Sequence, residues 1–363
     1  MSPSRVGARR LAALGIAPPR GGGAAAIEEV VSSHLALQAQ DLASGLWSVG
    51  LRTGASSDEV LGAIDDRLIT RSWPMRGTLH LMATRDVRWM CRLLGGRGIG
   101  RLRTRFAQLE LTDAVVDRAR DLFTSALAGG RGLTRAEVFV LLADHGIAPE
   151  GQRGIHLIGR FCQEGLLCQG PLVGRQPTFV LLDEWVPRSW DPGPEEAMAT
   201  LATRYVASHG PVRITDLAGW TGQTLAFARD SVAMAGDAIG AEELGGVTHL
   251  VHVHAPAAAP RAGTLLLPSF DEFLLGYKDR RAMLTREEEQ RVVPGGNGVF
   301  LSTVVVGGRV VGTWTRSTTA TGVALTVTTW ASTTPTRRRA IERAAAAYGT
   351  FVGLPVRLTF AAP

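Results

Sequence analysis

Cysteine, lysine and long apolar runs are all scarce in this 363-residue chain. The three cysteines, Cys91, Cys162 and Cys168, are an odd number without metal-binding spacing, which argues against a disulfide framework and favours a reducing compartment. No apolar run reaches the ~18 residues of a membrane-spanning helix. The first twenty residues lack the continuous apolar core of a signal peptide. We therefore expect a cytoplasmic protein that binds no membrane.

Because lysine is scarce, arginine carries almost all of the positive charge. Lys278 is the only lysine, and basic residues exceed acidic ones by six. Arginine forms bidentate contacts with phosphate and stacks on bases, so nucleic acid is the expected partner. A genomic bias toward arginine codons gives the same enrichment, and composition therefore favours this partner without establishing it.

One short pattern, two or three helices followed by a two-stranded hairpin, occurs three times. In the first copy we expect helices at 27–35, at 42–51 and from Ser56, where Ser56 and Glu59 have capping-box spacing. A β-like stretch at 68–81 follows. Helices followed by a hairpin are the outline of a winged helix. The expected units are 1–106, 107–190 and 191–260.

From residue 265 onward the pattern changes to short strands and turns. A hairpin is expected at 301–314 around Gly307–Gly308, and one late helix at 337–348. Residues 261–363 are therefore interpreted as a mainly β scaffold domain. The predicted fold class is α+β, with three tandem winged-helix units held by this scaffold.

Two glutamines, Gln38 and Gln40, flank Ala39 just before Asp41. In a helix these glutamines would lie about 200° apart. Asp41 is a good N-cap, which places 38–40 before the helix in an extended or turn conformation. Residues two apart then face the same way, so we expect both carboxamides to converge on one point. Neutral amides hold a water or a ligand but do not accept a proton strongly.

Five blocks carry a resemblance to a known family. They are Leu37–Asp41, Trp73–His80, Gly210–Gly222, Ser269–Arg280 and Gly307–Trp314. In their order and spacing the sequence resembles the bacterial winged-helix DNA glycosylases of the AlkZ type. The resemblance implies a C-shaped arrangement around duplex DNA, with Gln38 and Gln40 as the catalytic residues. A sister branch carries Asp at the second position, so Gln40 places the chain with the AlkZ-like branch.

The resemblance also implies the removal of alkylated purines, including bulky N7-guanine adducts of natural genotoxins and interstrand crosslinks. Alkylation at N7 makes guanine cationic, so the base leaves as a neutral molecule without protonation. The enzyme then has only to hold a water near C1′ and direct partial negative charge at the sugar, which carboxamides can do. We expect no cofactor and no metal, and a role in base excision repair or genotoxin self-resistance.

A lyase step would need an amine nucleophile. Lys278 is the only side-chain candidate, and it lies in a motif that looks structural. The acidic and basic residues of that motif, Asp271, Glu272, Asp279 and Arg280, are interpreted as structural ion pairs. The prediction is therefore a monofunctional DNA glycosylase.

Auxiliary candidates lie on the first hairpin, where Arg76, Thr78 and His80 share one face. This face should lie near the two glutamines. His80 either contacts phosphate or orients water, or is a plain strand histidine. Asp41 is a rival general base, but its N-cap role accounts for it better.

Four arginines, Arg97, Arg101, Arg103 and Arg105, either track a DNA backbone or form a solvated start of a helix. The glycines between the first two make that segment flexible enough to adapt to phosphates. We expect a monomer that binds duplex DNA containing alkylated purines. The alternative function is a non-enzymatic winged-helix DNA-binding protein, either a transcription regulator or a protein that sequesters a toxin.

Overall fold

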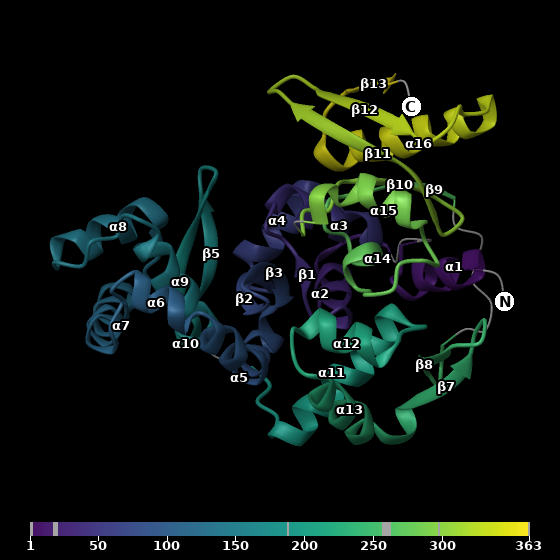
Figure 1. Cartoon of the computed structure of the whole chain (residues 1–363). Coiled ribbons are helices and arrows are strands. Elements are labelled where there is room, and N and C mark those ends of the chain that lie inside the picture. The colour runs from purple at the N-terminus through teal and green to yellow at the C-terminus, as the bar shows by residue number, and fades with distance from the viewer. Residues whose placement is uncertain (1–2, 17–20, 187–188, 256–262, 297, 362–363) are drawn as a thin grey trace.

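The computed structural model describes residues 3–16, 21–186, 189–255, 263–296 and 298–361. The domain boundary expected at 260/261 lies outside them. Helices and strands are mixed along the chain, and the α+β prediction is confirmed (Figure 1). Within the described residues, no helix is both long and apolar enough to cross a membrane.

The first unit follows the expected order of helices and hairpin. Its elements are α1 (Pro3–Ala13), α2 (Ala24–Ser33), β1 (Leu37–Gln38), α3 (Leu42–Thr53), α4 (Ser57–Asp65), β2 (Ile69–Met75) and β3 (Thr78–Ala83). The predicted capping box at the start of α4 is confirmed, because Ser56 and Glu59 bond reciprocally. The hairpin turns at Arg76–Gly77, where both residues have positive φ.

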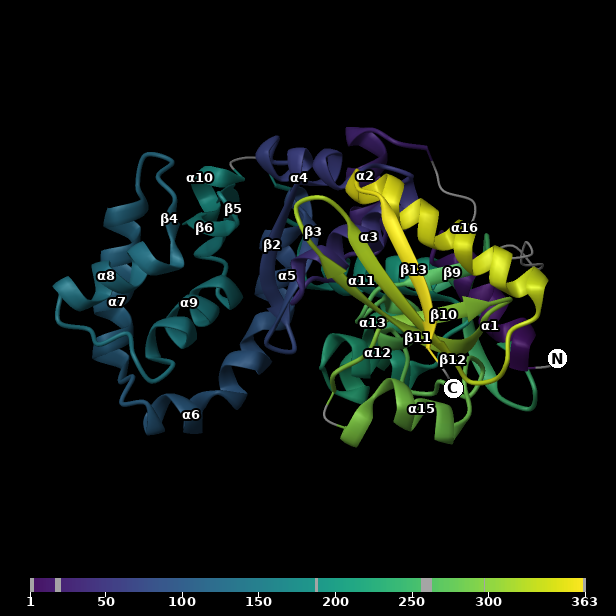
Figure 2. The same ribbon diagram turned by 90° about the horizontal axis from the view of Figure 1, so that it is seen from above.

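The second unit repeats this order and forms a lobe to one side, as Figures 1 and 2 show. Its elements are α5 (Thr84–Arg101), α6 (Arg103–Gln108), α7 (Asp113–Leu127), β4 (Leu133–Thr134), α8 (Arg135–Asp144), α9 (Arg153–Gln163), β5 (Leu167–Val173), β6 (Gln176–Leu181) and α10 (Leu182–Trp185). The expected boundary at 106/107 falls within α6.

One six-stranded sheet joins the first two units, in the order β1-β3-β2-β5-β6-β4. Arg71 of β2 lies opposite Gln169 of β5. The two hairpins are therefore not independent wings.

The expectation of a flexible glycine segment before Arg101 is wrong, because these glycines lie inside α5. A Cβ at Gly95 would meet the Gln163 carbonyl oxygen at 2.2 Å. Only glycine allows α5 to pack so closely on α9.

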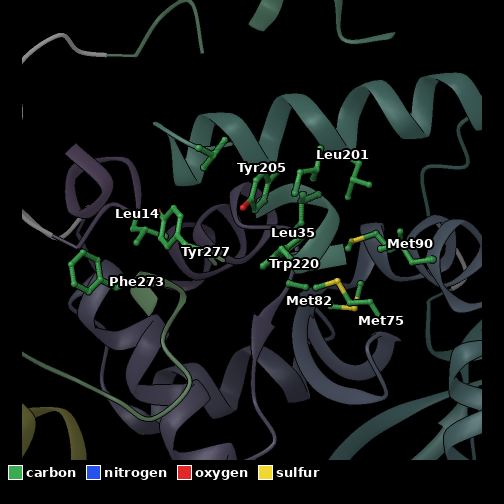
Figure 3. Close-up of a cluster of buried hydrophobic side chains, with 14 of the residues drawn as sticks. Leu14, Leu35, Met75, Met82, Met90, Leu201, Tyr205, Trp220, Phe273 and Tyr277 are labelled. Carbon is green, nitrogen blue, oxygen red and sulfur yellow. The ribbon is translucent and has the colours of Figure 1, made fainter. Parts of the chain in front are cut away.

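The third unit contains α11 (Pro194–His209), α12 (Ile214–Thr221), α13 (Leu225–Met234), η1 (Gly236–Ala238) and the separate hairpin β7 (Ile239–Glu243) and β8 (Thr248–His252). A core cluster connects it with the first hairpin and with the chain after residue 270. Figure 3 shows Tyr205, Trp220 and Tyr277 of this core lying together with Met75 and Met82. The third unit is thereby packed against both.

The C-terminal region is a five-stranded sheet in the order β13-β12-β11-β10-β9 with a long helix against it (Figure 2). Its elements are β9 (Thr264–Leu267), α14 (Glu272–Leu275), α15 (Arg286–Val292), η2 (Pro294–Gly296), β10 (Thr303–Val306), β11 (Arg309–Thr318), β12 (Val323–Thr329), α16 (Pro335–Val352) and β13 (Val356–Ala361). The Trp47 indole N–H of α3 donates to the Leu266 carbonyl at 2.8 Å. Trp47 also packs edge-on against Tyr348 of α16, with ring centroids 5.1 Å apart.

A buried ion pair holds the first unit on the C-terminal region. The Arg52 guanidinium donates to both Asp271 oxygens at 3.0 and 3.2 Å, and the Arg52 side chain has no exposed surface. Ser48 also donates to this carboxylate, at 2.9 Å. The expectation that Asp271 is structural is confirmed.

Replacing Asp271 with Asn should lower the free energy of unfolding by about 3–5 kcal/mol, because Arg52 then keeps a buried charge without a counter-ion. Urea denaturation of the purified protein measures this loss. The double variant Arg52→Met/Asp271→Leu should recover part of it, since neither buried charge remains. A loss below about 1 kcal/mol in Asp271→Asn would show that the pair is not essential.

Candidate active site

The segment carrying the two glutamines is extended, as predicted. Gln38 lies opposite His80 in the β1–β3 ladder, and the Ala39 N–H donates to the Leu79 carbonyl at 2.8 Å. The Gln40 Oε1 then accepts the Leu79 N–H at 3.1 Å. The Gln40 side chain therefore ends the ladder in place of a backbone carbonyl, and α3 begins at Leu42.

Gln38 lies against a cavity of about 880 Å³. The residue is only 7% exposed, yet its carboxamide has no hydrogen-bond partner among the described residues. We name this space the lysine cavity. Its side-chain lining is Gln38, Arg76, Thr78, Trp220, Leu275, Tyr277, Lys278, Arg280, Arg286, Glu289, Gln290, Val293 and Phe300.

Gln40 lies against a second cavity, of about 780 Å³, between the first hairpin and the second unit. We name it the aromatic cavity. Its side-chain lining is Gln40, Arg71, Trp73, Leu79, Leu102, Arg135, Ala136, Phe139, Ile155, His156, Gln163, Gln169, Gln176, Pro177 and Phe179. The two carboxamides thus lie against different cavities and not at one point as expected, because Gln40 is bonded back onto β3.

His80 lies beside Gln38 but does not reach solvent. Its exposed fraction is 0%, so the expected phosphate contact is wrong. Nδ1 donates to the Thr78 carbonyl at 2.8 Å, and Nε2 faces the Arg76 Nη2 at 3.0 Å. Because Arg76 can only donate, Nε2 is the acceptor. Burial, together with the Arg76 charge, holds the pKa of His80 well below its usual value, so the imidazole is neutral and orients the guanidinium.

Arg76 brings an uncompensated charge to the lysine cavity. Among the described residues no carboxylate forms an ion pair with it. Burial lowers the Arg76 pKa, and the Glu272 carboxylate opposes that shift. A guanidinium held by a neutral imidazole and facing a cavity is suited to bind an anion.

Asp41 occupies the predicted N-cap position of α3 but makes no side-chain bond to a helix N–H. Its carboxylate instead accepts from the Ser44 hydroxyl at 2.6 Å and pairs with Arg316 at 2.5 Å. Asp41 lines neither cavity. An ion-paired carboxylate at this place is poorly suited to be the general base.

The four candidate DNA-binding arginines lie at the end of α5 and in α6. Arg97, Arg101 and Arg103 are exposed and Arg105 is half-buried. Arg105 donates to the side-chain amides of Gln108 and Gln152. Among the described residues, no carboxylate forms an ion pair with any of the four.

Arg101 also lies near the lysine cavity. A Cβ at Gly222 would be 3.2 Å from Arg76 Cγ and 4.0 Å from an Arg101 guanidinium nitrogen. The two cations therefore flank the same turn, and Arg101 extends the positive charge of the cavity to the surface.

The chain was compared with known proteins. The family described as "DNA glycosylase AlkZ-like" matches residues 31–351. The chain belongs to the AlkZ-like DNA glycosylase family. Of the two functions that the sequence left open, the family favours the enzyme over the non-enzymatic DNA-binding protein.

Two comparisons with individual proteins agree with the AlkZ-like assignment. The chain is 28% identical over 351 residues to the interstrand DNA cross-link repair glycosylase of Streptomyces sahachiroi, covering 91% of this chain and 92% of the relative. The solved structure of the S. sahachiroi DNA glycosylase AlkZ has a TM-score of 0.81 at 27% identity. That comparison covers 99% of this chain and 100% of the other.

In this AlkZ-like chain the motif at 271–280 is structural, as predicted, but it also contributes to the lysine cavity. Glu272 accepts from the Trp220 indole at 2.8 Å, and Asp279 pairs with Arg281 at 2.6 Å. Lys278 differs, because its side chain crosses Gly219, where a Cβ would be 2.5 Å from Lys278 Cε. Sequence reasoning missed this placement, although the rarity of lysine was a signal for it.

The His80 environment makes stability depend on pH. The folded-state pKa lies below the unfolded value of about 6.5. The contribution of His80 is therefore fully present above about pH 6.5 and is lost as the pH falls toward the folded-state pKa. Between pH 7.5 and 5, His80→Gln should reduce the slope of unfolding free energy against pH, by at most about 1.4 kcal/mol per unit.

Urea denaturation at several pH values measures these slopes. His145→Gln, at an exposed histidine, is the control. Equal slopes in wild type and His80→Gln would contradict the neutral assignment of His80.

Proposed function

We propose that this chain is a monofunctional DNA glycosylase that hydrolyses the N-glycosidic bond of N7-alkylated purines in duplex DNA. Gln38 and Gln40 are the proposed catalytic residues. The proposal is supported most by one observation: Gln38, a residue that is only 7% exposed, lines a cavity rich in cations and its carboxamide makes no hydrogen bond to the described residues. The carboxamide therefore remains available to a water or a sugar in the cavity.

The charges around the lysine cavity suit a base that leaves without being protonated. Among the residues that the structure describes, Glu289 is the only carboxylate that lines the lysine cavity, and it is paired with Arg280 at 2.7 Å. Among the described lining residues, none is therefore a free general acid or base. A purine alkylated at N7 needs no proton to leave, so neutral amides suffice for it and would release normal bases poorly.

The two glutamines can have different roles in the reaction. The Gln38 carboxamide oxygen is placed to accept a hydrogen bond from the attacking water and to face the positive sugar. As the water oxygen bonds to C1′ the N-glycosidic bond breaks, the N7-alkylated base leaves as a neutral molecule with the bonding electron pair, and the water's proton passes to solvent. The Gln40 oxygen is occupied by the Leu79 N–H, which leaves its NH2 group to position the substrate. Residues two apart in an extended segment have Cα atoms about 7 Å apart, so one nucleotide at the end of β1 can touch both.

Arginine and lysine side chains would hold the DNA backbone. Arg76, Lys278 and Arg286 line the lysine cavity without a carboxylate partner among the described residues. The exposed arginines of α5 and α6 would continue this positively charged surface beyond the lysine cavity. We extend to this chain the crosslink repair that the name of its relative states, and we propose a cytoplasmic monomer acting in base excision repair or genotoxin self-resistance.

Replacing Gln38 and Gln40 together with Ala should reduce release of the modified base from a duplex containing one N7-methylguanine by at least about 100-fold, the usual cost of losing a transition-state hydrogen bond. Alkaline cleavage of the abasic product on a gel measures the rate. Thr350→Ala, at an exposed residue of α16 outside both cavities, should keep full activity. Strand breaks in wild-type reactions before alkali would refute the monofunctional assignment, and undiminished release by the double variant would refute the roles of the glutamines.

Replacing Arg101 with Gln should weaken duplex binding about equally for damaged and undamaged DNA. The slope of log K against log salt should become shallower by about one unit, because one phosphate contact is lost. Fluorescence anisotropy between 50 and 200 mM salt measures both effects. Arg357→Gln, an exposed arginine on β13, should leave the slope unchanged. If both variants change it equally, Arg101 has no special role in binding.

A further inference from the structure

The aromatic cavity has the walls of a binding site for a flat ring. Trp73 and Phe179 are stacked with ring centroids 6.5 Å apart and an interplanar angle of 20°. Phe139 of α8 lies in the same lining, with the Arg135 guanidinium 5.0 Å from its ring centroid. No aspartate or glutamate lines the cavity among the described residues. Flat apolar walls of this kind accept a planar group.

Polar atoms without partners lie in this lining. Arg71 is 9% exposed and Gln169 is 4% exposed, and the two lie opposite each other across β2 and β5. Within the described parts of the chain, the Arg71 Nε and the Gln169 Oε1 have no hydrogen-bond partner. Side-chain amides of Gln40 and Gln176 lie in the same lining. Donors and acceptors beside aromatic walls are what a heteroaromatic ring with ring nitrogens and carbonyls requires.

The volume of the aromatic cavity and the open space beside Gly159 also suit a planar ring. A volume of about 780 Å³ lies within the ~300–1,000 Å³ typical of small-molecule sites. Gly159 of α9 contributes to the lining, and a Cβ added there would meet nothing within 4 Å. The cavity is therefore not closed by the surrounding packing at this position.

We propose that the aromatic cavity binds a planar aromatic group presented by the damaged nucleotide. This inference rests on the proposed glycosylase function, because Gln40 connects the cavity to the glutamine segment. Two sources supply such a group: the ring of a bulky substituent attached at N7, and the modified base itself when it is turned out of the duplex. Both are flat, and both would lie against the aromatic side chains that line the cavity.

The test uses a variant that fills the aromatic cavity and should leave the fold unchanged. Gly159→Leu places a side chain in open space and replaces a helical glycine with a better helix former, so the variant should remain folded. Gly62→Leu in α4 is the matched control, since Gly62 also has nothing within 4 Å and lines neither cavity. Release is measured from duplexes carrying one N7-methylguanine or one N7-benzylguanine.

The two substrates distinguish the sources. A loss of kcat/KM of at least about tenfold for the benzyl adduct alone assigns the cavity to the substituent. An equal loss for both adducts, with unchanged affinity for undamaged duplex, assigns it to the everted base. Rates in Gly159→Leu equal to those of Gly62→Leu on both substrates would overturn the inference while leaving the glycosylase proposal intact.

A binding measurement separates this inference from the function on which it rests. If the wild type releases neither base, the glycosylase proposal fails, and free 7-benzylguanine is then titrated against the intact protein while tryptophan fluorescence is followed. Saturable quenching in the wild type and in Gly62→Leu, but not in Gly159→Leu, supports the cavity as a site for planar groups. Absence of saturable quenching in the wild type would overturn it.

Discussion

Two adjacent buried carboxylates, Asp271 and Glu272, determine where the rest of the site can lie. Asp271 is compensated by Arg52 of the first unit, and Glu272 accepts from Trp220 of the third. Buried charges without partners are strongly unfavourable, so these contacts favour the docking of the chain after residue 270 on both units. That docking places Tyr277 and Lys278 across the lysine cavity from Gln38. A cavity built from three distant parts of the chain thus depends on one polar junction.

The distribution of charge around the glutamines explains which chemistry the site can support. Asp41 and Glu289, carboxylates near the glutamines or in the lysine cavity, are both paired with arginine. His80 is neutral and already bonded through both ring nitrogens. What remains unpaired is cationic or neutral, which favours an anionic backbone and a base that departs without a proton. The family assignment independently indicates a DNA glycosylase.

Local signals in the sequence predicted local structure well, whereas contacts between distant segments could not be predicted. The capping box expected at Ser56 is present, because it needs only residues three apart. The glycines of α5 suggested flexibility, but Gly95 is needed where α5 meets the α9 backbone some seventy residues later, a contact that the sequence alone does not reveal. The turn of Gln40 onto Leu79 and the pairing of β2 with β5 are likewise long-range. The sequence was therefore enough to propose Gln38 and Gln40 as site residues. It was not enough to predict the lysine cavity and the aromatic cavity that they line.

Strand β3 is a shared wall of both cavities. Successive side chains of a strand point to opposite faces, and here Thr78 lines the lysine cavity while Leu79 lines the aromatic cavity. The Leu79 N–H also holds Gln40. A group that binds in the aromatic cavity therefore contacts the same strand that positions both glutamines. Recognition of the lesion and hydrolysis would then involve residues on opposite faces of one strand.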